Sequence, residues 1–139
     1  MTDAYVDPDR ERFGRFKALP RDGVIHMLNL VKLNEVATYE DGTTSTGAEA
    51  YAAYGRESLP IFEGLGGRIV WSGSFDLTLI GPQDEDWDIC FIAEYPSAEA
   101  FIGMIRNPDY QKAVKHRQAA VKTSRLIRTR PRDPGKGFG

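Results

Sequence analysis

The sequence contains a single cysteine, Cys90, and only two histidines, His26 and His116, among its 139 residues. One cysteine excludes an internal disulfide bond and any metal cluster built on several cysteine ligands. Cys90 stands in an apolar stretch, so a small buried side chain is the simplest interpretation. The two histidines are too far apart to form a metal-ligand motif. We therefore expect no metal site and no bound cofactor.

Long hydrophobic runs are also missing, and the first residues lack the basic and then apolar pattern of a signal peptide. The composition, with 41% hydrophobic and 27% charged residues, is typical of one globular domain that buries its own core. The net charge of −2 does not favour nucleic acid as a partner. We expect a soluble cytoplasmic protein that binds neither nucleic acid nor membrane.

The charges are segregated along the chain. Residues 112–132 contain no acidic residue, whereas acidic residues gather at 84–88. The basic residues of the first segment are Lys112, Lys115, Arg117, Lys122, Arg125, Arg128, Arg130 and Arg132. The basic segment lacks the interleaved aromatic residues of a single-strand binder. Two interpretations of this segregation remain open. Either both charged segments form solvated faces, or the basic segment forms a face that binds an anion.

Hydrophobic periodicity predicts four strands and two main helices after a short N-terminal helix. The strands are expected at 24–33, 68–80, 87–95 and 124–130. The helices are expected at 46–65 and 97–121, the second one restarting at Asn107-Pro108. Thr46 and Glu49 match a capping box at the start of the first. Asp7 and Pro8 predict the start of the N-terminal helix.

This βαββαβ order predicts a ferredoxin-like α+β fold with an extra N-terminal helix, in which both helices cover one face of an antiparallel sheet. Neither set of alternate residues along the strands is polar, so the face of the sheet that the helices leave uncovered is also apolar. We therefore expect a second copy of the chain to cover that face in a homodimer. We divide the chain into an N-terminal helical extension at 1–22, the ferredoxin-like domain at 23–131 and a mobile tail at 132–139. The polar segment 34–45 is interpreted as a long loop, with or without a small hairpin, that serves as a lid, a dimer arm or plain decoration.

Several motifs resemble those of an uncharacterised family, domain of unknown function 1330, over most of residues 23 to 130. They are Met27-Leu28-Asn29-Leu30-Val31-Lys32, Tyr51-Ala52-Ala53-Tyr54, Gly66 to Gly73, Trp87, Tyr95-Pro96-Ser97-Ala98-Glu99-Ala100 and Pro108 through Arg117. The resemblance implies a dimeric α+β barrel of ferredoxin-like subunits. That superfamily includes cofactor-free monooxygenases, small-acid isomerases, haem-degrading proteins and non-enzymatic stress proteins, so it does not imply one activity.

Pockets in this superfamily lie between sheet and helices, and candidate site residues are polar or aromatic groups on those elements. They are Asn29, Tyr54, Arg68, Trp71, Trp87, His116 and Arg117. We expect Asn29 and Tyr54 to converge with one of the tryptophans on a mostly apolar cavity. Arg117 interrupts the apolar stripe of its helix, so we expect it to face a carboxylate or a bound anion. Each of these residues also has a purely structural interpretation.

Three functions are compatible with the sequence. The first is a homodimer that binds a small organic molecule, either neutral or anionic, between sheet and helices. The second is a cofactor-free monooxygenase or isomerase, in which His116 or Tyr54 moves a proton and Arg117 or Arg68 holds an anionic oxygen. The third is a structural dimer without catalysis. The sequence does not decide whether the protein is an enzyme.

Overall fold

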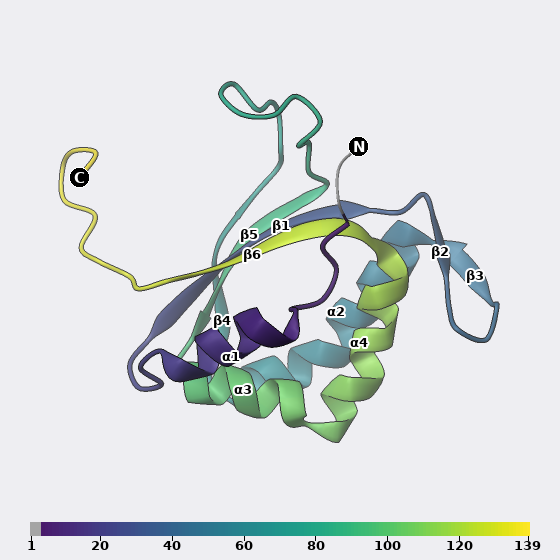
Figure 1. Cartoon of the computed structure of the whole chain (residues 1–139), viewed down its shortest axis with the longest axis horizontal. Helices are drawn as coiled ribbons and strands as arrows, with labels where there is room; N and C mark the ends of the chain where they lie inside the picture. Colours follow the sequence, from purple (N-terminus) through teal and green to yellow (C-terminus); the bar gives the residue numbers. More distant parts are fainter. Residues whose placement is uncertain (1–3) are drawn as a thin grey trace.

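The fold is built on a four-stranded antiparallel sheet, seen in a computed structural model that describes residues 4–139. The strands lie in the order β4-β5-β1-β6 and are β1 (Ile25–Leu33), β4 (Arg68–Gly73), β5 (Ile89–Tyr95) and β6 (Val121–Thr129). Helices α2 (Gly47–Gly64), α3 (Ala98–Arg106) and α4 (Pro108–Ala120) cover one face of the sheet (Figure 1). The predicted ferredoxin-like arrangement is confirmed.

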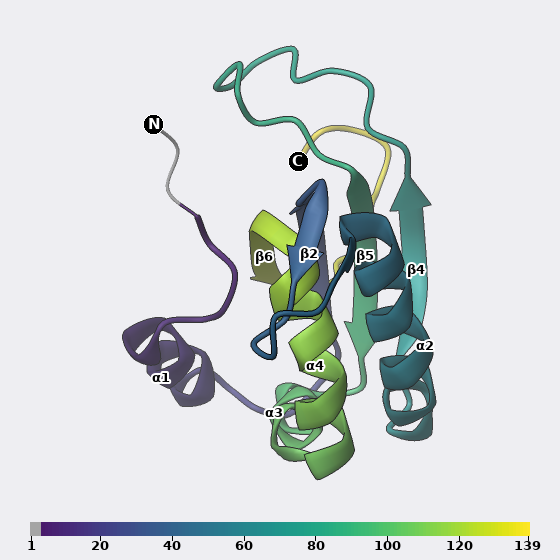
Figure 2. The ribbon, with the colours of Figure 1, turned by 90° about the vertical axis from the view of Figure 1, so that its right-hand side faces the viewer.

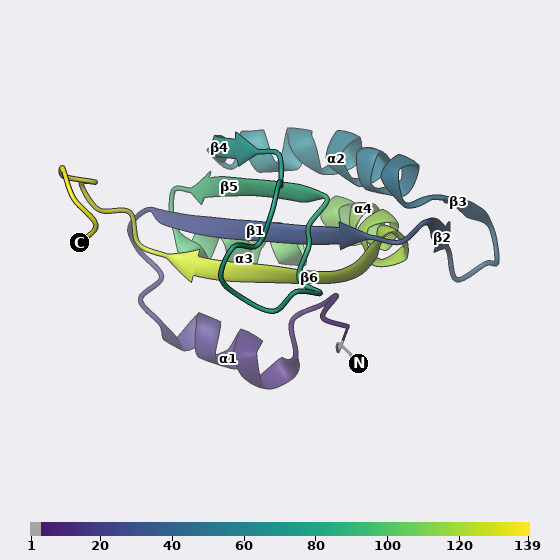
Figure 3. The same ribbon diagram turned by 90° about the horizontal axis from the view of Figure 1, so that it is seen from above.

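The two faces of the sheet differ in burial. On β1, the side chains of Ile25, Met27 and Val31 are at most 3% exposed and point toward the helices, which defines the helix face. The alternate side chains point the other way and define the open face, where Leu28 lies between Ile92 of β5 and Ile127 of β6. Figure 3 looks onto this open face, with the helices behind the strands. The main core therefore lies between the helix face and the helices.

Segment 34–45 contains a small hairpin of β2 (Val36–Thr38) and β3 (Thr44–Thr46), which leads directly into α2. The capping box is present, because the Thr46 hydroxyl accepts from the amide of Glu49 at 3.0 Å and the Glu49 carboxylate accepts from the amide of Thr46 at 3.1 Å. This hairpin packs near the end of α4, where Ala37 is fully buried in a cluster with Ala50 and Ala119. The start of α2 and the small hairpin agree with the prediction.

The N-terminal helix, α1 (Arg10–Ala18), begins two residues later than predicted. Asp9, rather than Asp7, caps it by accepting from the amide of Arg12 at 2.7 Å. The helix lies beside β6, at the edge of the sheet (Figures 2 and 3). Its Phe16 packs on Phe101 of α3 with a centroid distance of 5.1 Å. The N-terminal extension therefore closes the β6 side of the helix layer.

The strand predicted at 68–80 ends at Gly73, and residues 74–88 form an irregular loop. The backbone amide of Asp88 donates to Val31 at 2.8 Å, and its carboxylate accepts from the amide of Leu33, so the chain before β5 bonds to β1 rather than to β4. We call residues 74–88 the β4–β5 loop. It stands above the open face in Figure 1. Its apolar residues Leu77, Leu79 and Ile80, which were predicted to lie in a strand, are exposed instead.

No helix within residues 4–139 combines the length and the hydrophobicity needed to cross a membrane. Apart from β4, the strand boundaries differ from the predicted ones by a few residues at most.

Candidate functional site

Four tyrosines from three elements meet between the helices and the sheet, and we call them the tyrosine cluster. Tyr51 and Tyr54 come from α2, Tyr95 from β5 and Tyr110 from α4. The hydroxyls of Tyr54 and Tyr110 are 2.7 Å apart, and the rings of Tyr51 and Tyr54 have centroids 5.5 Å apart. The three-residue spacing on α2 places its two tyrosines on one helix face, and strand alternation turns Tyr95 toward them.

The phenols of the tyrosine cluster are held in their neutral form. Burial is the largest cause and raises the pKa of Tyr51, Tyr54, Tyr95 and Tyr110. Neighbouring phenols raise the pKa of three of them further, because two phenolates would repel each other. A neutral phenol keeps its proton and can donate a hydrogen bond to an anion.

Two hydroxyls of the tyrosine cluster have no hydrogen-bond partner among the described residues. These are the hydroxyls of Tyr51 and Tyr95, for which residues 4–139 provide no donor or acceptor within bonding distance. No fully buried side-chain nitrogen or oxygen of the described chain lacks a partner. Solvent therefore reaches both hydroxyls at least in part.

Arg117 of α4 brings a positive charge to this cluster. Its charge lowers the pKa of Tyr51, Tyr54 and Tyr110, in opposition to burial. The guanidinium donates to the carbonyl of Val6 at 2.5 Å and to the hydroxyl of Ser124 at 3.3 Å. It forms no ion pair with a carboxylate within residues 4–139. The predicted carboxylate partner is thus replaced by two neutral oxygens, and the bound anion stays a prediction.

The N-terminal segment closes the outer side of Arg117. The carbonyl of Tyr5 accepts from the Ser124 hydroxyl at 2.7 Å, and the Asp7 carboxylate accepts from the Gln118 amide at 3.2 Å. The ring of Tyr5 lies under the guanidinium of Arg125, 4.9 Å from its centroid. The extension therefore seals the space between α4 and β6 next to Arg117.

Asn29 shares the helix face with the tyrosine cluster, but the tryptophans do not. Asn29 pairs with Phe91 across the sheet and donates to the carbonyl of Met27 at 3.0 Å. Trp71 pairs with Ile92 on the open face and is 49% exposed. A register shift between Ile69 and Trp71 decides this orientation. The structure therefore does not bring Trp71 together with Asn29 and Tyr54.

Trp87 also lies away from the tyrosine cluster. It is buried at the end of the β4–β5 loop, and its ring lies 5.3 Å from the guanidinium of Arg125. The side chain opposite Arg125 is that of Leu30, which shares the open face with Leu28. The binding of a ligand by Trp87 stays a prediction.

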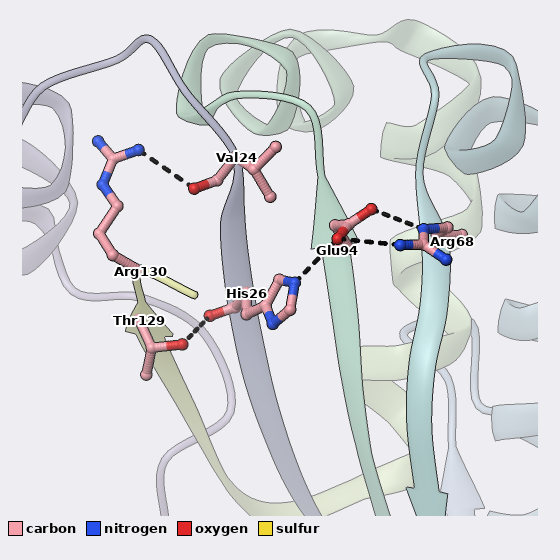
Figure 4. A network of polar contacts seen from close by, with 6 residues as sticks. All are labelled: Val24, His26, Arg68, Glu94, Thr129 and Arg130. Carbon is pink, nitrogen blue, oxygen red and sulfur yellow. Dashed lines mark hydrogen bonds and ion pairs between the residues drawn. The ribbon is translucent and has the colours of Figure 1, made fainter. Parts of the chain in front are cut away.

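Arg68 belongs to a polar network on the open face (Figure 4). Its Nε donates to Glu94 at 2.7 Å, and Nε2 of His26 lies 2.9 Å from the other carboxylate oxygen. The hydrogen bond from Arg68, and then that from His26, lowers the pKa of Glu94. Thr129 of β6 donates to the carbonyl of His26 at 2.8 Å. The network ties together all four strands, so Arg68 has a structural role that is independent of any ligand.

His116 lies outside the tyrosine cluster, in a chain of hydrogen bonds that the sequence did not suggest. Its Nδ1 is 2.6 Å from the hydroxyl of Tyr39 and its Nε2 is 2.7 Å from the carboxylate of Glu57. Tyr39 is 77 residues away along the chain, so no local pattern pointed to it. Glu57 lies one helical turn after Tyr54. This spacing is the only feature of the sequence that could have indicated Glu57 as a site residue.

Two hollows lie elsewhere on the surface. One, of about 460 Å³, is an open groove between α2 and α3 whose lining includes Ile61, Leu65 and Met104. The other, of about 210 Å³, is formed by residues 130–139. Neither is lined by a residue predicted for the site. Within residues 4–139, no cluster of histidine, cysteine or carboxylate side chains is suited to hold a metal ion.

The family model described as "Domain of unknown function (DUF1330)" matches residues 42–129. The chain belongs to this family. A crystal structure of methylated RPA0582 protein is 61% identical and has a TM-score of 0.93, with 97% of this chain and 100% of that chain covered. A second structure, of the RPA0582 protein of unknown function from Rhodopseudomonas palustris, is 62% identical over 95% of this chain and 100% of that chain, with a TM-score of 0.90.

More distant structures share the fold alone with this DUF1330 chain. A putative antibiotic biosynthesis monooxygenase from Bacteriodes thetaiotaomicron is 16% identical, with a TM-score of 0.51, and 84% of this chain and 97% of that chain are covered. No curated protein matches the sequence.

Proposed function

We propose that the protein binds a small organic anion in the interior between α2, α4 and the sheet, with Arg117 as its charged group. The observation that carries this proposal is the partly buried guanidinium of Arg117, which has no carboxylate partner among the described residues. A charge in such a place is costly unless an opposite charge compensates it. A ligand carboxylate would supply that charge.

The surrounding side chains support a carboxylate attached to an aromatic or keto group. The neutral phenols of Tyr51 and Tyr95, whose hydroxyls have no partner among residues 4–139, can donate to ligand oxygens, and their rings offer apolar walls. Asn29 of β1 lies on the same face of the sheet. Tyr54 suits this binding role better than that of a base, because its pKa is raised and its hydroxyl already bonds Tyr110.

Phenylpyruvate is a suitable probe for this site, and Arg117→Met is the variant that removes the charge while keeping most of the volume. At ten times its Kd, a ligand that binds only the folded state adds about 1.4 kcal/mol to the free energy of unfolding. We expect wild type to show such a gain with phenylpyruvate in calorimetric unfolding, and Arg117→Met to lose it.

Lys115→Met is the matched control, since Lys115 is an exposed cation on the same helix. It should keep the stabilisation by phenylpyruvate. Equal stabilisation of wild type and Arg117→Met, or none in either protein, would contradict the proposed site. Stability of Arg117→Met without ligand is read in the same scans, which separates loss of binding from loss of folding.

We further propose that the open face joins two copies of the chain into a homodimer. Leu28, Ile92 and Ile127 form its apolar centre, and Ile127 is 46% exposed. The β4–β5 loop stands above this face, with Leu79 and Ile80 exposed by 82% and 94%. A loop with such an apolar tip suits contact with a second copy, because the removal of apolar surface from water is favourable.

Sedimentation at micromolar concentration tests the homodimer. Wild type should sediment as a dimer of 15.5 kDa subunits. Ile127→Lys should sediment as a monomer, since it places a charge in the apolar centre of the proposed interface. Leu59→Lys, which changes an equally exposed apolar residue on α2, should remain a dimer. A wild-type monomer, or an unchanged Ile127→Lys dimer, would refute this interface.

A further inference from the structure

A hydroxyl, an imidazole and a carboxylate stand in series where the β2–β3 hairpin meets α4 and α2. The Tyr39 hydroxyl lies 2.6 Å from Nδ1 of His116, and Nε2 of His116 lies 2.7 Å from an oxygen of Glu57. The rings of Tyr39 and His116 meet edge to face, with an interplanar angle of 83°. The hairpin and α2, which are adjacent in sequence, and the distant α4 therefore direct these groups at one another.

The chain of hydrogen bonds has one direction when the imidazole is neutral. The carboxylate of Glu57 can only accept, so the ring proton of His116 resides on Nε2. Nδ1 then carries a lone pair and accepts the hydroxyl proton of Tyr39. A hydroxyl that faces a base, which is itself oriented by a carboxylate, is the arrangement that activates an oxygen nucleophile.

The hairpin holds Tyr39 in place independently of His116. The amide of Tyr39 donates to Thr43 at 2.9 Å, and the carbonyl of Tyr39 accepts from Gly42 at 2.9 Å. Its ring packs against the buried cluster of Ala37, Ala50 and Ala119. The hydroxyl is thus positioned by the fold rather than by the hydrogen bond alone, as a reacting group requires.

The three side chains are also partly exposed to solvent. Tyr39 is partly buried, the His116 side chain is 26% exposed, and that of Glu57 is 49% exposed. Lys112 lies one turn before His116 on the same side of α4. It is exposed and forms no ion pair within residues 4–139. A cation one helical turn from His116 favours a substrate with an anionic group.

We propose that Tyr39 is the nucleophile of an acyl-transfer site in which His116 is the base and Glu57 is a positioning residue. The substrate class is a small ester that carries a carboxylate, which Lys112 attracts. This site lies outside the tyrosine cluster and does not depend on ligand binding there.

The reaction needs no oxidant, reductant or metal ion to balance. The Tyr39 oxygen forms a bond to the acyl carbon while its proton moves to Nδ1 of His116. The ester C–O bond breaks, and the proton on Nδ1 passes to the leaving alcohol. Water then attacks the acyl-tyrosine with His116 as base, which releases the carboxylic acid and restores the Tyr39 hydroxyl.

The test uses p-nitrophenyl acetate, whose leaving group is a visible phenolate. Wild type should release p-nitrophenolate at least tenfold faster than Tyr39→Phe, and any trapped acetyl group should map to Tyr39 rather than to the exposed Tyr5. Glu57→Gln keeps an acceptor oxygen but removes the charge that stabilises the imidazolium. It should reduce the rate at least tenfold while the fold, checked by circular dichroism, is kept.

His26→Gln is the matched control, because His26 also pairs with a glutamate but belongs to the network on the open face. It should leave the rate unchanged. Lys112→Gln should raise KM for mono-p-nitrophenyl succinate by a larger factor than KM for the neutral acetate. Equal rates for wild type and Tyr39→Phe, or for wild type and a folded Glu57→Gln, would show that the three residues only fasten the hairpin and would overturn the proposal.

Discussion

Raising the pH above 10 should destabilise the protein steeply, because the folded state keeps four phenols protonated. Burial raises the pKa of Tyr51, Tyr54, Tyr95 and Tyr110 above the ordinary value of 10.0. The unfolded chain loses these protons from about pH 10 upward, while the folded protein retains them. The contribution is therefore fully present below pH 10 and is lost above it, by about 1.4 kcal/mol per pH unit for each phenol.

Urea unfolding at pH 8, 10, 11 and 11.5 measures this slope, and absorbance at 295 nm reports phenolate. Phenolate from the tyrosine cluster should appear together with unfolding rather than before it. Tyr95→Phe should remove one phenol's share of the slope, and it is the cleanest variant because the Tyr95 hydroxyl has no protein partner among residues 4–139. Tyr5→Phe, at the surface, is the control. A slope that does not change in Tyr95→Phe would contradict the argument.

A single methyl group at Gly47 should be the most damaging small substitution in the chain. Gly47 is the first residue of α2 and is buried. A Cβ atom there would lie 1.9 Å from the carbonyl oxygen of Asn34, which is backbone and cannot rotate away. Asn34 is held in turn by a 2.8 Å hydrogen bond from its amide to the carbonyl of Ala120. We expect Gly47→Ala to destabilise the protein by about 3 kcal/mol, the upper part of the range for overpacking.

Gly103→Ala is the matched control for this variant. Gly103 lies within α3, is exposed, and has no atom within 4 Å of an added Cβ. Replacing a glycine inside a helix by alanine should stabilise the protein by about 0.5–1 kcal/mol. Urea unfolding measures the free energy of unfolding of both variants. A Gly47→Ala protein as stable as wild type would be incompatible with the tight contact. The same variant should also loosen Tyr39 from His116, since the hairpin must shift.

The order of elements could be predicted because each depends on neighbouring residues. The capping box of Thr46 and Glu49, the almost continuous apolar run that predicted β1 and the restart at Pro108 are local patterns, and all three elements are present in the structure. Local patterns fail where a competing partner lies far away in sequence. The alternation at 74–80 suggested a strand, but residues just before β5 bond to β1, and this leaves Leu77, Leu79 and Ile80 exposed.

The candidate site was predictable only in part, for the same reason. The sequence identified Tyr54 and Arg117, because a tyrosine and an arginine on apolar helical stripes are visible in one helix at a time. It placed Trp71 on the wrong side of the sheet relative to Asn29, since one register shift on β4 reverses the alternation.

By itself, the sequence determined the ferredoxin-like order of strands and helices, through periodicities that neighbouring residues impose. The tertiary structure decided which side chains meet. The contact of Tyr39 with His116 spans 77 residues, and that of Arg117 with Val6 spans 111. Such contacts depend on strand register, helix packing and the path of the N-terminal segment, which leave no periodic trace in sequence because each involves a single pair of residues.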